Sequence, residues 1–117
     1  MACLQDCVET LLLAGEPREA EACLLDFEAR FPETMRPALR ACAAITYAHL
    51  GQKEQAAAWL DTLSKRDKSA VAHHARACVA ALDGAPKKTV KHHIDSARKA
   101  DREAALLERD PLFSPYR

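Results

Sequence analysis

Aromatic side chains and glycines are scarce in this 117-residue chain, which has one Trp, two Tyr, three Phe and three Gly. Hydrophobic residues nevertheless make up 49% of the sequence, and alanine is the commonest of them. A sheet core needs β-branched and aromatic side chains, whereas small side chains allow helices to pack closely. The composition therefore predicts an all-α protein. The length fits one domain, residues 1–117.

Net charge is also absent, because 17 Lys and Arg balance 17 Asp and Glu. Nucleic-acid binders usually carry a basic excess. The one basic stretch, residues 87–99, is interrupted by Asp95 and is typical of a solvated helix face. The charge pattern argues against nucleic acid as a partner.

Long apolar runs are missing too, and none approaches the roughly 18 residues that cross a bilayer. The first residues include Asp6 and Glu9 and have no basic region ahead of their apolar positions, unlike a signal peptide. These features predict a cytoplasmic protein with no membrane segment.

The cysteines are odd in number and form no CxxC pair. In a compartment that keeps thiols reduced, they are expected to be free and to serve as small apolar residues. A redox switch is the alternative for Cys3, Cys7 and Cys23, because Cys3 and Cys7 are one helical turn apart and Cys23 lies on the next predicted helix. The other two are Cys42 and Cys78.

Apolar residues at helical spacing alternate with turn signals along the whole chain. A glycine follows three of these apolar helical patterns and is expected to end the helix, at Gly15, Gly51 and Gly84. The pattern predicts three antiparallel helical hairpins followed by a C-terminal cap, over residues of about 2–34, 37–69, 70–100 and 101–117.

The three glycines are 36 and 33 residues apart, close to the 34-residue period of tetratricopeptide repeats. Around Gly51, the residues Tyr47, Ala56 and Leu60 give an aromatic, small and large apolar sequence typical of that family, and Ala20, Leu24 and Pro32 follow Gly15 in the same way. The chain therefore resembles a tetratricopeptide repeat protein.

The third unit departs from this pattern. Thr89 stands where the family has alanine in its second helix, and His93 stands where it has a large apolar residue. We therefore expect the second helix of this unit to be irregular or to pack differently.

The resemblance implies a right-handed α-solenoid whose first helices line a concave groove. It favours a non-catalytic protein–protein interaction module, an adaptor or small chaperone, that binds an apolar or amphipathic peptide segment of another protein. Small helical-repeat chaperones of bacterial secretion systems are similar in size. The groove positions implied by the resemblance are Gln5, Glu9, Leu12, Leu13, Ala41, Ile45, Ala48, His49, His74, Cys78 and Leu82.

Two other occupants of that groove are open at this point, the chain's own tail and a second copy of the chain in a homodimer. One kind of partner is excluded. The repeat domains that clamp acidic C-termini use Lys, Arg and Asn side chains, and the corresponding positions here are Gln5, Glu9, Cys42, Val71 and Ala75.

The histidine pairs His73-His74 and His92-His93 lie on consecutive predicted helices, with Cys78 nearby. They support an alternative function, a metal- or redox-responsive protein. No HExxH or comparable signature accompanies them, so we expect no metal site and no cofactor.

Signatures of catalysis are absent from the sequence as well. It has no glycine-rich phosphate loop, no nucleophile elbow and no organised triad. We therefore expect no catalytic residues and no enzyme activity.

Overall fold

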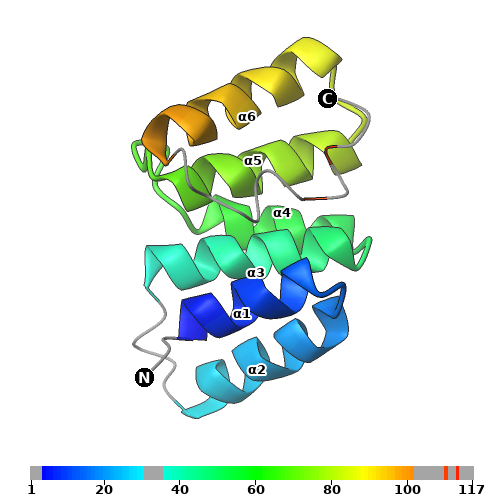
Figure 1. Ribbon diagram of the computed structural model, residues 1–117, viewed down its shortest axis with the longest axis vertical. Coiled ribbons are helices and arrows are strands. Elements are labelled where there is room, and N and C mark those ends of the chain that lie inside the picture. The colour runs from blue at the N-terminus through cyan, green and yellow to red at the C-terminus, as the bar shows by residue number, and fades with distance from the viewer. Residues whose placement is uncertain (1–3, 31–35, 102–109, 111–112, 114–117) are drawn as a thin grey trace.

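The computed structural model is built from helices throughout the part of the chain that it describes (Figure 1). The structure describes all residues except 1–3, 31–35, 102–109, 111–112 and 114–117. The helices are α1 (Leu4–Leu13), α2 (Pro17–Arg30), α3 (Pro37–His49), α4 (Lys53–Asp61), α5 (Ala70–Leu82) and α6 (Lys87–Ala100). The prediction of an all-α fold is confirmed. None of these helices is long and apolar enough to cross a membrane.

Consecutive helices pair as hairpins, α1 with α2, α3 with α4 and α5 with α6. The hairpins stack along the long axis of a molecule measuring 39 × 27 × 25 Å (Figure 1). Contacts also join α1 to α3 and α3 to α5, so the first helices of the hairpins form one continuous layer. The third helix is the centre of the stack, because it contacts α1, α2, α4 and α5.

The three hairpins share the same turn. At Gly51, the glycine N–H donates to the Ala48 carbonyl oxygen at 3.0 Å and the Gln52 N–H donates to that of Tyr47 at 2.9 Å. Equivalent pairs of bonds follow α1 and α5, and the three glycines have φ of 76°, 75° and 73°. This is the Schellman ending of a helix, which needs a left-handed residue after the last turn. The predicted role of the glycines is confirmed.

The third hairpin differs from the others by one residue. Helices α2 and α4 begin two residues after their glycines, whereas α6 begins at Lys87, three residues after Gly84. As a result Thr89 is exposed and its neighbour Val90 is fully buried, in the position that Ala20 and Ala56 take in the first two hairpins. The expected irregularity is therefore a shift in where the helix starts.

Small side chains fill the middle of the stack. Every residue of α3 from Ala41 to Ala48 is buried, and Ala72, Ala75 and Ala77 of α5 are fully buried. Cys42 and Cys78 are buried in the same core and neither forms a disulfide, as predicted. Cys7 and Cys23 are free as well.

Candidate functional site

The fifth helix places two chemically useful side chains on one face. Ser69 caps its start, because the Ser69 hydroxyl accepts a hydrogen bond of 3.3 Å from the Ala72 N–H. The Asp67 carboxylate in turn accepts from the Ser69 N–H at 3.0 Å, and this bond lowers the pKa of Asp67. With the helix start held in this way, His74 and Cys78 are four residues apart and so lie one above the other.

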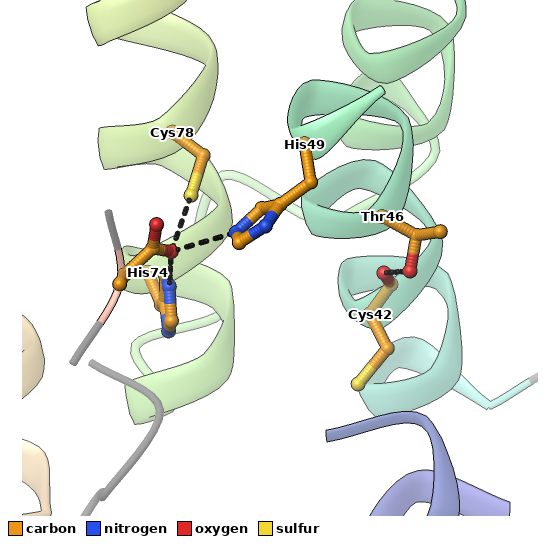
Figure 2. Close-up of polar contacts among 6 residues, drawn as sticks. Cys42, Thr46, His49, His74 and Cys78 are labelled. Atoms are coloured by element: carbon orange, nitrogen blue, oxygen red, sulfur yellow. Dashed lines mark hydrogen bonds and ion pairs between the residues drawn. The ribbon is translucent and has the colours of Figure 1, made fainter. Parts of the chain in front are cut away.

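The third helix contributes the facing histidine. His49 is its last residue, directly before the turn at Gly51, and its side chain is only 6% exposed. One turn earlier the Thr46 hydroxyl donates to the Cys42 carbonyl oxygen at 2.8 Å, which satisfies a buried hydroxyl within the helix. Figure 2 shows the His49 ring pointing from α3 across to the carboxylate beside α5.

Three side chains converge on one oxygen of Asp110, which is fully buried. The Oδ2 atom lies 2.7 Å from Nε2 of His74, 3.1 Å from Nε2 of His49 and 3.4 Å from Sγ of Cys78, which donates to it (Figure 2). A buried carboxylate needs such donors, since each replaces a hydrogen bond to water. We call these four residues the Asp110 cluster.

The carboxylate of Asp110 is held in its ionised form. Burial by itself raises the pKa of a carboxyl group, but the hydrogen bonds and electrostatic interactions with His49 and His74 outweigh it and bring the pKa of Asp110 far below its usual range. The pKa of the Cys78 thiol is shifted in the opposite direction. Burial, then the charge and hydrogen bond of Asp110, raise its pKa well above the ordinary value, so it is a protonated thiol and a poor nucleophile.

Phe113 closes the cluster on one side. Its side chain is 2% exposed, and its ring centroid lies 5.2 Å from that of His74, with the rings tilted by 49°. The Phe113 N–H donates to the Asp110 carbonyl oxygen at 3.1 Å, so one turn carries both residues. Asp110 and Phe113 therefore lie together against the layer of first helices, Asp110 at His49 of α3 and both residues at His74 of α5.

Most of the predicted groove positions are buried in this structure. Ala41, Ile45 and Ala48 are at most 1% exposed, and α3 is packed on several sides. Leu12, His74 and Cys78 are buried too. Solvent reaches Glu9, Leu13, His49 and Leu82 to different degrees, and the side chain of Gln5 lies outside the described part.

Among the described residues, the histidines of the sixth helix are not part of the group of possible metal ligands that contains Cys78. His92 is exposed, and its ring centroid lies 5.6 Å from that of His93. Within the described chain, the buried Nδ1 of His93 has no hydrogen-bond partner. His73 instead lies against Arg76, whose Nη1 is 3.4 Å from the His73 Nδ1.

Sequence reasoning missed Asp110 as a site residue. Its partners His49, His74 and Cys78 were all among the predicted groove positions, but the Asp-Pro pair at 110–111 reads as a helix ending. One sequence feature could have pointed to this site. His74 and Cys78 lie four residues apart on an otherwise alanine-rich helix, so their side chains share one face. Ligand atoms of His49, Cys78 and Asp110 lie within 4.8 Å of one another, which makes these three the candidate metal-binding group of the described chain.

Comparisons with protein-family models, with curated proteins and with solved structures each find no match to this chain. The class of protein is thus defined by fold and site together. It is an all-helical stack of three hairpins in which histidines of two successive first helices bind a carboxylate near the C-terminal end.

Proposed function

We propose that this chain is a non-catalytic, cytoplasmic protein–protein interaction module, an adaptor or small chaperone of the tetratricopeptide type. In this proposal the hairpins form a right-handed α-solenoid, and the layer of α1, α3 and α5 binds a peptide segment of a partner protein. The repeated glycine turns and the contacts of α3 with both α1 and α5 support this reading.

One observation carries the proposal. The layer of first helices already holds a short acidic and aromatic segment, since Asp110 bonds to His49 and His74 and Phe113 packs on the His74 ring. Side chains that hold this segment in cis have the chemistry to hold a similar one in trans. The partner segment is therefore mainly apolar. It carries one Asp or Glu, followed three positions later by an aromatic residue.

The chain's own segment competes with any such partner. A segment attached to the same chain acts at an effective concentration of about millimolar. A partner peptide must overcome this concentration, so weakening the contacts of Asp110 and Phe113 is expected to expose the site and to strengthen binding in trans.

The test uses a fluorescent peptide with the sequence of residues 106–117, LLERDPLFSPYR. The full chain carrying both Asp110→Asn and Phe113→Ala should bind it at least about tenfold more tightly than the wild-type chain does. Circular dichroism checks that the double variant keeps its helicity.

Two controls identify the contacts. A peptide in which the same Asp and Phe are replaced by Asn and Ala should bind weakly, and adding His74→Ala to the double variant should abolish binding. Equal binding of the two peptides, or no binding to a folded double variant, would contradict the proposal.

A further inference from the structure

The Asp110 cluster brings together three different kinds of metal ligand. A ring nitrogen of His49, the sulfur of Cys78 and a carboxylate oxygen of Asp110 lie within 4.8 Å of one another. In a tetrahedral zinc site the metal bonds measure about 2.0–2.3 Å, so the ligand atoms are about 3.2–3.8 Å apart. A contraction of about 1 Å by side-chain rotation would complete such a site.

We propose that His49, Cys78 and Asp110 bind a divalent transition-metal ion of the zinc class, with His74 orienting the carboxylate. Zinc accepts nitrogen, sulfur and oxygen ligands together. Calcium and magnesium prefer oxygen ligands alone, and only Asp110 supplies them here. The inference does not depend on peptide binding, and it assigns this cluster a role that the proposed function does not use.

Charge balance favours the bound ion. As the metal–sulfur bond forms, the Sγ–H proton of Cys78 leaves to solvent, and a neutral His49 binds through the lone pair of one ring nitrogen and keeps its proton on the other. The ion's two positive charges then meet one thiolate and one carboxylate. With a neutral His74 donating its Nε2–H to the carboxylate, the sum is zero, which suits a position where Cys78 and Asp110 are both fully buried.

His74 is a positioning residue in this site. Its Nε2 atom lies 2.7 Å from Oδ2 of Asp110, and a hydrogen bond to a ligating carboxylate fixes the direction in which the oxygen points. Phe113 covers the His74 ring and shields the cluster. Three protein ligands leave the fourth tetrahedral position to a water molecule.

The ion would also join distant parts of the chain. His49 ends α3 and Cys78 lies in α5, and Asp110 follows these two residues by 61 and 32 positions. Since an unfolded chain does not hold these three side chains together, bound metal should stabilise the folded state.

The first test is a titration of the full, chelator-treated wild-type chain with Co²⁺, followed by Zn²⁺. We expect one equivalent of Co²⁺ to give the visible bands of a tetrahedral site and a near-ultraviolet thiolate-to-cobalt band, and Zn²⁺ to displace it and raise the Tm. A wild-type chain without these bands, whose Tm is unchanged by Zn²⁺, would overturn the proposal whatever the variants do.

Variants then assign the ligands. Cys78→Ser should lose the thiolate band, and Asp110→Asn should weaken Co²⁺ binding by at least about tenfold. His74→Gln should weaken binding by about 10–100-fold while keeping the thiolate band, because it removes a support and not a ligand.

Cys42→Ser is the matched control, since Cys42 is as fully buried as Cys78 and lies outside the group of metal ligands. It should leave the spectrum and the affinity unchanged. If Cys78→Ser and Asp110→Asn, shown to be folded by circular dichroism, bind Co²⁺ as the wild-type chain does, the ion sits elsewhere and the proposal fails.

Discussion

Nε2 of His74 lies 2.7 Å from Oδ2 of Asp110, and the two side chains are 5% and 0% exposed. These residues are 36 positions apart, so the bond ties the C-terminal end of the chain to the middle of α5. A short bond to an ionised carboxylate in a dry environment is among the stronger polar contacts in a protein.

Replacing Asp110 by Asn should destabilise the protein by about 1–3 kcal/mol. The variant keeps the shape of the side chain but loses the charge that His49 and His74 stabilise. Urea unfolding of the metal-free chain, followed by circular dichroism, measures the change. Asp95→Asn is the control, because Asp95 is 66% exposed and pairs with Arg98 at 3.7 Å, and its effect should stay within about 0.5 kcal/mol. Equal effects of the two variants would contradict the importance of the cluster.

Replacing Phe113 by Ala should open the cluster locally while the helices stay folded. Phe113 is 2% exposed and covers His74, but it lies outside the six helices, so its contact can open while they stay folded. We expect His74 to react severalfold faster with a histidine-modifying reagent, as read by mass spectrometry, with little loss of helicity. Leu25→Ala, at a 48% exposed side chain, should leave the His74 rate unchanged. An unchanged rate in the Phe113 variant would mean that Phe113 does not protect the site.

Replacing Gly51 by Ala should cost about 1 kcal/mol in the free energy of unfolding. A Cβ at this position meets nothing within 4 Å, so the cost comes only from the φ of +75°. Gly51→Asn should cost less, because Asn tolerates the left-handed region better than Ala does. Urea unfolding of the two variants tests this ranking, and an Ala variant as stable as the wild-type chain would refute it.

The stability of the protein should fall as the pH is lowered from 7 to 5, in part because of His93. Burial, then the charges of His92, His73 and Arg76, lower the pKa of His93 in the folded chain below its value of about 6.5 in an unfolded one. The unfolded state therefore takes up more protons across this window, and protonation favours unfolding. Above about pH 7 both states are neutral at this site and the effect disappears.

His93→Leu removes the titrating group and should reduce the drop in Tm between pH 7 and pH 5 by a few degrees. His92→Gln is the matched control at an exposed neighbour, and it should reduce the drop less. Thermal melts at both pH values provide the measurement, and a drop of the same size in His93→Leu and wild-type chains would contradict the assignment.

Local rules were sufficient for much of the fold. The three glycines, their intervals and the apolar stripes between them predicted six helices and three hairpins, because a Schellman ending depends on a few consecutive residues. The apolar stripe of Val90, Ile94 and Ala97 also predicted the buried side of α6 correctly, whereas the repeat pattern did not. A start one residue later changes which side of the helix is buried, so Val90 and Ile94 are buried where the repeat pattern had pointed to Thr89 and His93.

By itself, the sequence determined the helical class, the turns and the use of Cys42 and Cys78 as buried residues outside any disulfide. Only the tertiary structure decided that Asp110 meets His49 and His74, because Asp110 is 61 and 36 positions away from them in the sequence. The burial of Ala41 and Ile45 likewise depends on helices packed around α3. Periodicity reports which face of a helix is apolar, but what covers that face is set by the rest of the chain.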